Sequence, residues 1–261
     1  MAEDINKNND NEKVLIEVYK DAISPAAKEV GKMVSLPFQA INAALSGARI
    51  WVAEKQYNYD RTLKLLAKKM EDIPTDNISS PENYIAVPAL QQISYCYDSD
   101  ELRDMYANLL ASSMQKDKKW KVHPSFVEII KQLLPDEAKL IKYLATKEVA
   151  ATLTLRAVDE DETGIDILKN YSLVGYEAGC DSPKSIGVYI NNLSRLGLII
   201  NYTGIRYLTD KELYERIKCD NFMKMHADKI LKRNAQNKPN YEEGYIQLSD
   251  LGNNFCNICI R

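Results

Sequence analysis

The chain changes character after residue 147, and this change restricts the folds open to it. Before that point, apolar residues recur at the three- and four-residue spacing of amphipathic helices. Residues 149–158 read VAATLTLRAV, where β-branched residues are frequent and Leu153, Leu155 and Ala157 alternate with polar neighbours, as in a half-buried strand. The pattern predicts a mainly α protein, with an N-terminal helical domain followed by a smaller α+β domain.

The 261 residues are enough for two domains of ordinary size. Residues 1–12 are polar and lack periodicity, which predicts a disordered tail; residues 13–133 then form the helical domain and 134–261 the second domain. Asp98 and Glu101 have the spacing of a capping box before the helix that follows. Helices are predicted at about residues 24–72 with a bend near Pro37, 88–97, 102–114, 123–134 and 135–146.

The second domain resembles a winged helix-turn-helix domain in the order of its elements. A helix beginning at Ser182-Pro183 and stopped by Gly197 would be the recognition helix. The acidic run at 159–162 is a loop, and 164–180 fits neither helix nor strand clearly. The remaining elements are a strand at 198–202, a helical insertion at about 205–240, a strand at 244–248 and a last helix at 249–260.

Charge and cysteine content narrow the class of protein. A net charge of −3 and a pI near 5.6 give no overall attraction to nucleic acid, whose binding domains usually have a pI above about 9. The five cysteines are odd in number and scattered, and the first residues do not form a signal peptide. These features predict a cytoplasmic protein with reduced thiols.

The exposed side of the predicted recognition helix is the candidate contact surface of the second domain. Asparagine and arginine can read base edges, but phosphate contacts supply much of the affinity for DNA. Two cations on this surface are few, although the insertion carries nine Lys or Arg against five Asp or Glu, a net +4. Packing or protein contact is therefore favoured over DNA binding. The candidate contact residues are Lys184, Ser185, Asn191, Asn192 and Arg195.

A second candidate surface is the helix at 30–53, which is apolar or small except for one narrow polar stripe. Such a helix must be covered on several sides. The favoured interpretation is a bundle core or a contact between subunits, hence a homo-oligomer. The alternative is transient contact with a membrane surface. The residues of this candidate oligomer or membrane face are Val30, Met33, Phe38, Ile41, Leu45 and Trp51.

No motif in the sequence carries chemistry. Cys256 and Cys259 form a CxxC pair without the second ligand pair that zinc requires, so buried apolar cysteines are favoured. The acidic run at 159–162 lacks the spacing and glycine of a calcium loop, and a solvated loop is favoured. His123 before Pro124 suits a helix start or the surface. We expect no catalytic residue, no metal and no cofactor, and the interpretation leans away from an enzyme.

Four stretches together resemble the abortive-infection alpha family over residues 20–261. They are the apolar helix after Val30, PSFVEIIKQLLPDEAKLIKYLA at 124–145, YINNLSRLGLI at 189–199 and LSDLGNNFCNICI at 248–260. The resemblance implies a bacterial or mobile-element protein that limits phage by abortive infection, with no catalytic residue to carry over.

Three functions are open at this point. The leading one is a non-enzymatic defence protein that contacts a phage or host protein, oligomerises, or reaches the membrane. The second is a winged-helix transcriptional regulator that binds DNA. The third is a nuclease or other enzyme whose site is assembled from scattered residues.

Overall fold

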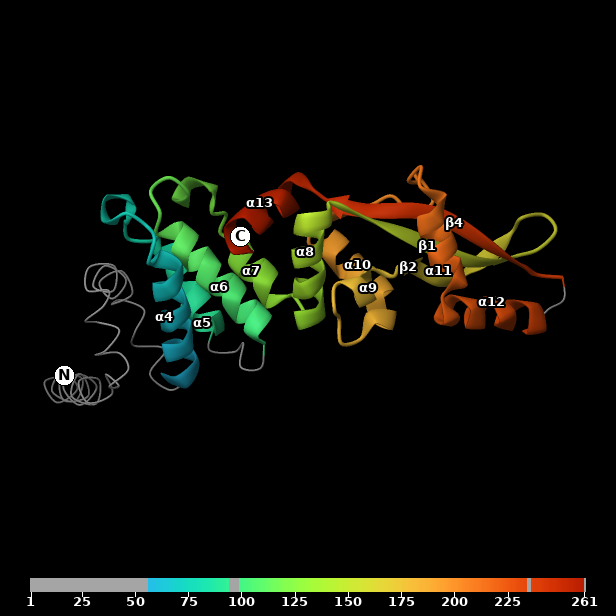
Figure 1. Cartoon of the computed structure of the whole chain (residues 1–261), viewed down its shortest axis with the longest axis horizontal. Helices are drawn as coiled ribbons and strands as arrows, with labels where there is room; N and C mark the ends of the chain where they lie inside the picture. Colours follow the sequence, from blue (N-terminus) through green and yellow to red (C-terminus); the bar gives the residue numbers. More distant parts are fainter. Residues whose placement is uncertain (1–55, 94–98, 234–235, 261) are drawn as a thin grey trace, which may run out of the picture.

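The computed structural model describes residues 56–93, 99–233 and 236–260. They form an elongated molecule with a helical bundle at one end and, at the other, an antiparallel sheet accompanied by further helices (Figure 1). The mixed α+β, mainly α class predicted above is confirmed at this level. The predicted tail at 1–12 and the candidate face from Val30 to Trp51 lie outside the described residues.

The helical end is built around α6, which packs against each of its described helical neighbours. Tyr106 and Leu110 of α6 are fully buried, and the Tyr106 hydroxyl donates to the carbonyl of Val127 at 3.2 Å. The helices here are α4 (Gln56–Met70), α5 (Asn83–Ile93), α6 (Asp100–Ser113), α7 (Ser125–Lys131) and α8 (Pro135–Lys147).

One predicted helix start in this region is wrong. Helix α5 begins at Asn83, so Pro88 lies inside it. Pro88 has no N–H to donate to the carbonyl of Tyr84, one turn earlier in the helix. Tyr84 is exposed, so water can reach this carbonyl. The cap of α6 is Ser99, because its hydroxyl accepts the amide of Leu102 at 3.2 Å, and Asp98, the cap predicted from the sequence, lies outside the described residues.

The sheet has the order β2-β1-β4-β3, and every pair is antiparallel. The predicted strand at 149–158 is confirmed as β1, but β4 begins at Lys238, inside the predicted insertion. The long β1 explains the difference, since it supplies backbone partners for β4 as far as Val158 opposite Lys238. The strands are β1 (Val149–Val158), β2 (Gly164–Tyr171), β3 (Ile199–Asn201) and β4 (Lys238–Leu248).

The segment at 164–180, which the sequence left open, contains strand β2 and the short helix α9 (Val174–Glu177). The helical insertion predicted at about 205–240 contains two helices, α11 (Lys211–Cys219) and α12 (Asn221–Arg233). They separate at Asp220, which is extended and accepts the amide of Phe222 at 2.9 Å, so its carboxylate caps α12.

The region of the predicted recognition helix contains a 3-10 turn at Pro183–Ser185 and helix α10 (Ile186–Arg195). Ile190 and Leu193 are fully buried, so the apolar side of α10 faces the core as predicted. Gly197 ends the helix with a φ of +74°, a conformation that glycine adopts without the steric cost of a side chain.

The last helix, α13 (Asp250–Cys259), returns from the sheet to the helical end and packs on α6 (Figure 1). Asn108 and Ser112 of α6 donate side-chain hydrogen bonds, both 3.0 Å long, to the carbonyls of Cys259 and Ile258. One connected hydrophobic core therefore runs from the helices into the sheet. The proposed boundary near Leu134 has residues of this core on both sides of it in the sequence, and it stays a prediction.

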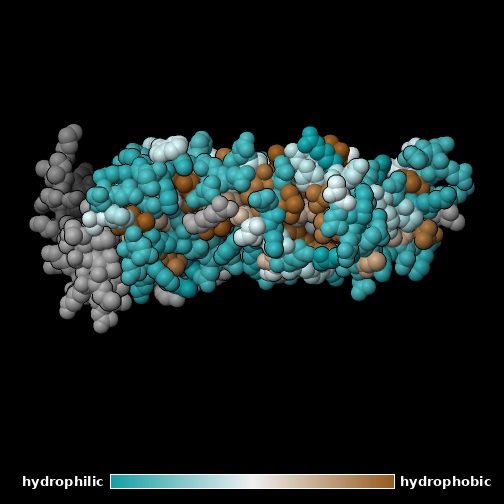
Figure 2. All heavy atoms as spheres, turned by 45° about the horizontal axis from the view of Figure 1, so that its top comes forward, coloured by the Kyte–Doolittle hydropathy of each residue, from teal (hydrophilic) through white to brown (hydrophobic). Residues whose placement is uncertain are grey.

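Hydrophilic residues dominate the face drawn in Figure 2, and hydrophobic residues reach that surface in small groups. Within the described ranges, no helix combines the length and apolar character needed to cross a membrane.

Candidate functional site

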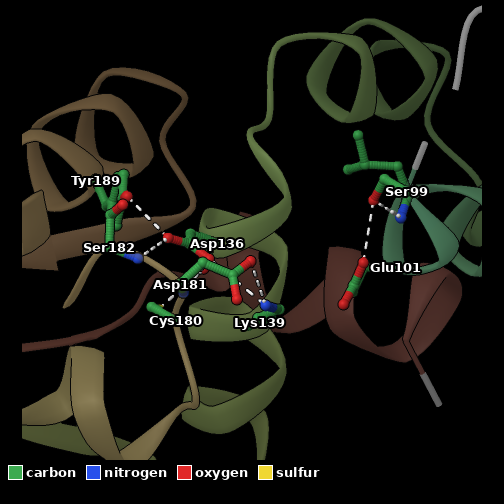
Figure 3. Close-up of polar contacts among 9 residues, drawn as sticks. Ser99, Glu101, Asp136, Lys139, Cys180, Asp181, Ser182 and Tyr189 are labelled. Carbon is green, nitrogen blue, oxygen red and sulfur yellow. Dashed lines mark hydrogen bonds and ion pairs between the residues drawn. The ribbon is translucent and has the colours of Figure 1, made fainter. Parts of the chain in front are cut away.

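The candidate contact surface of α10 is positioned by Asp136, the second residue of α8 (Figure 3). Its carboxylate accepts the amides of Asp181 at 2.8 Å and Ser182 at 2.9 Å, together with the Tyr189 hydroxyl at 2.9 Å. Lys139 pairs with the Asp181 side chain at 2.9 Å. The segment before α10 is thus held to the N-terminus of α8 by hydrogen bonds from its backbone amides and by the ion pair of its Asp181 side chain.

The charge of Asp136 is favoured by these donors although the side chain is buried. Burial by itself raises the pKa of a carboxyl group, but the two amides, the Tyr189 hydroxyl and Lys139 outweigh it and leave the pKa of Asp136 below its usual value. Burial and the bond to Asp136 raise the pKa of Tyr189 to about 12. At neutral pH, Asp136 is therefore ionised and Tyr189 is a neutral donor.

Two of the five predicted contact residues are engaged within the protein. Asn192 donates to Glu137 Oε2 at 2.8 Å and to the carbonyl of Gln132 at 3.1 Å. Arg195 Nη2 donates to Asn192 Oδ1 at 2.7 Å and to Gln132 Oε1 at 3.1 Å. The C-terminal part of the surface is thereby joined to the α7–α8 junction, and the Asn192 amide and Arg195 Nη2 already have partners.

The other three predicted residues lie toward the start of α10. Asn191 is exposed, and its side-chain oxygen accepts a bond of 3.1 Å from Asn170 of β2. Ser185 is half-buried. The Lys184 ammonium lies 5.3 Å from the ring centre of Phe222, at a pocket of about 400 Å³ that Arg216 also lines. The structure thus separates Lys184 from Asn192 and Arg195.

Sequence reasoning missed Val188, which is 64% exposed on α10. It lies three residues before Asn191 and seven before Arg195, so these side chains share one side of the helix. Its spacing from the buried Ile190 and Leu193 could have revealed this, because a helix that buries those positions turns Val188 outward. We call Val188, Asn191 and Arg195, together with Lys184 in the turn just before the helix, the α10 face.

The family model described as abortive infection alpha matches residues 54–259. The chain belongs to the abortive infection alpha family. No curated protein matches it. Among solved structures, an uncharacterized protein from the hydrocarbon-degrading marine bacterium Alcanivorax borkumensis SK2 is 21% identical, with a TM-score of 0.38, over 55% of this chain and 94% of that one.

In this abortive infection alpha protein, the CxxC cysteines lie within the core. Cys256 and Cys259 are buried, as predicted, and burial raises the pKa of the Cys259 thiol well above its usual value. Cys219 and His226 are residue types that could bind zinc, but they belong to α11 and α12, whereas α13 packs on α6. Among the residues with described positions, no group of three or more His, Cys, Asp or Glu side chains could hold a metal ion.

The two remaining features of the sequence have local roles in this family member. The acidic run at 159–162 is exposed, and Asp159 accepts the amides of Asp161 and Thr163 within the turn. His123 stands before α7, where its Nδ1 accepts the amide of Ser125 at 3.1 Å and contacts the Ser125 hydroxyl at 2.6 Å. The preferred interpretations, a solvated loop and a helix-start residue, agree with these contacts.

Proposed function

We propose that this member of the abortive infection alpha family acts in phage defence by binding a phage or host protein through the α10 face. The family match supplies the process, abortive infection. The α10 face supplies a surface that is held rigidly by Asp136 and the Asn192–Arg195 contacts. We further propose that the protein acts by contact rather than by catalysis.

A winged-helix reading of the second domain supports this choice of surface. Helices α9 and α10 precede the short strand β3, and β4 pairs with both β3 and β1. In helix-turn-helix proteins, the second helix of the pair is the one that presents its outer side to a ligand. The insertion of α11 and α12 between β3 and β4 would then replace a simple wing.

The observation that carries the proposal is the exposed Val188 in the middle of the α10 face. Protein interfaces combine an apolar centre with a polar rim, and here Lys184 and Asn191 flank the apolar side chain. A DNA-reading helix instead needs exposed donors and acceptors, several of which Asn192 and Arg195 use internally. Contact with protein is therefore favoured over contact with DNA.

The thiol of Cys180, beside Asp136, is not activated as a nucleophile. Burial, followed by the neighbouring charge of Asp136, raises the pKa of the Cys180 thiol to about 11, so this thiol is protonated at neutral pH. Only the thiolate is an effective nucleophile. From the sequence, we also propose that the protein forms a homo-oligomer or acts on a membrane. Both proposals depend on the face from Val30 to Trp51, which lies outside the described residues.

The test is infection of bacteria expressing this chain, at low and at high phage multiplicity, while phage yield and cell survival are followed. Abortive defence predicts a reduced yield at low multiplicity and collapse of the culture at high multiplicity. Replacing Val188 by Glu should abolish protection, because an unpaired charge in an apolar contact costs roughly 2 kcal/mol or more, over tenfold in affinity.

The matched control replaces Leu231 on α12, which is 52% exposed, by Glu. This variant should protect as well as the parent protein. Equal loss of protection in both variants, or full protection with Val188→Glu, would contradict the proposed surface. Salt-sensitive gel-shift binding that weakens in Lys184→Ala and Arg195→Ala would favour the DNA-binding regulator instead.

A further inference from the structure

A second cavity lies at the helical end of the molecule, away from the α10 face. Its volume is about 660 Å³, and α4, α6, α8 and the end of α13 enclose it. Cavities that hold small ligands usually measure about 300–1,000 Å³. The proposed contact surface leaves this cavity without a role.

The rim of the cavity is rich in cations. Arg61, Lys64 and Lys68 line it from α4, and Lys142 lines it from α8. The spacings of three and four place the α4 residues on one side of that helix, in a row about 10 Å long at 1.5 Å per residue. Two helices thus present positive side chains to the same space.

Three carboxylates also line the cavity, and each already has a partner. Asp100 pairs with the buried Arg103 and with Arg61, and Asp104 pairs with Lys69 at 2.6 Å. Glu101 accepts a bond of 3.1 Å from Ser99.

The three lysines of the rim differ from these carboxylates in their polar contacts. Within the ranges that the structure describes, the ammonium groups of Lys64, Lys68 and Lys142 are exposed and form no hydrogen bond or ion pair. Positive charge is therefore available to a ligand.

The floor of the cavity is apolar. Leu65, Met105, Ala138, Cys259 and Ile260 line it, and Met105 and Ala138 are otherwise buried in the core. The Cys259 carbonyl is already engaged by Asn108. A sugar or another polar group placed here would lose its hydrogen bonds to water without replacement, whereas an alkyl chain would gain by burial.

We propose that this cavity binds an anionic amphiphile. The lysines would hold a carboxylate or phosphate group at the rim, and the alkyl chain would cover Leu65 and Met105. A free fatty acid and a phospholipid of a bilayer share this chemistry. The inference is independent of the proposed protein contact, since it uses other residues at the other end of the chain's fold.

Calorimetric titration of the full-length protein tests the site with decanoate below its micelle-forming concentration. Saturable binding of one decanoate per chain is expected. The triple variant Lys64→Gln, Lys68→Gln, Lys142→Gln should weaken it about tenfold, because three exposed charges that attract the carboxylate are removed. Binding of decanol, which has the same chain and no charge, should change less than about twofold, because the floor is intact.

The matched control removes three exposed lysines from α12, as Lys224→Gln, Lys229→Gln, Lys232→Gln. It changes the net charge equally and should leave decanoate binding unaltered. A second arm uses vesicles with and without an anionic phospholipid: capture that needs the rim lysines, without decanoate binding, identifies a bilayer lipid as the source. Absence of binding in both arms, or equal loss in both triple variants, would overturn the proposal.

Discussion

Asp136 is the single residue on which the geometry of the α10 face depends most. It is 6% exposed, and its three hydrogen-bond donors come from the segment before α10 and from α10 itself. A buried carboxylate is stable only when such donors replace water. Removing its charge therefore affects both the stability of the protein and the placement of Lys184.

We expect Asp136→Asn to lower the free energy of unfolding by about 2 kcal/mol at pH 7, because charge-assisted bonds are lost and an amide would face N–H donors. The folded-state pKa of Asp136 is below its ordinary value of 3.8. Its contribution is therefore complete above about pH 4–5 and is lost as the pH falls through the folded-state pKa. Urea unfolding of both proteins between pH 2 and 7 measures this difference.

The control for this prediction is Asp181→Asn. The Asp181 side chain is 83% exposed and pairs with Lys139, so its removal should cost well under about 1 kcal/mol at neutral pH. A difference between the parent and Asp136→Asn that stays constant down to pH 2 would contradict the assigned role of the carboxylate.

Among the elements, α13 depends on a close approach to the start of β3. The cap of α13 is Ser249, whose hydroxyl accepts the amide of Gly252 at 2.9 Å, and the Ser249 amide donates to the Leu198 carbonyl at 3.0 Å. A Cβ atom at Gly252 would lie 1.9 Å from that same Leu198 oxygen. The helix can therefore take this position only because residue 252 lacks a side chain.

Replacing Gly252 by Ala tests two opposing effects. In an unconstrained helix, this change stabilises by up to about 1 kcal/mol. Here the contact with Leu198 must be relieved by moving backbone, which we expect to cost more, for a net loss of about 1–3 kcal/mol. Thermal unfolding followed by circular dichroism measures it. Asn253→Ala, an exposed neighbour in the same helix, should change stability by less than about 0.5 kcal/mol; a stabilised Gly252→Ala would refute the argument.

Across the whole molecule, α13 connects the two ends of the fold. Phe255 is fully buried and meets Phe126 edge-to-face at a centroid distance of 5.3 Å. Asn108 and Ser112 hold the end of α13 to the helical bundle. The hydrophobic core is continuous through α13. The helical end and the sheet are therefore stabilised by one connected set of buried side chains.

We expect the helical end and the sheet to unfold together in one transition. Native-state hydrogen exchange should then give the slowest amides of α6 and of β1 the same free energy of opening, within about 1 kcal/mol. Exchange measured by mass spectrometry on peptides covering both elements provides the comparison. Two well-separated values would instead mean that the predicted boundary near Leu134 divides independently stable domains.

Several elements follow from local features of the sequence. The alternation from 149 to 158 predicts β1, Gly197 predicts the end of α10, and the pattern at 249–260 predicts α13. Each depends on neighbours along the chain, either through the side-chain period of a strand or helix or through the backbone freedom of glycine. Such preferences act before any distant contact forms, so one sequence is sufficient to read them.

Other features depend on residues far apart in the chain. Strand β4 extends to Lys238 because β1 lies beside it, and Asn192 is unavailable to a partner because the fold brings Gln132 and Glu137 to it. The rim lysines likewise meet only where α4 and α8 enclose one cavity. By itself, the sequence determined the helices and strands that local preference specifies and the family to which the chain belongs. Only tertiary packing decided which polar groups remain accessible, because burial and hydrogen-bond partners are properties of the folded chain.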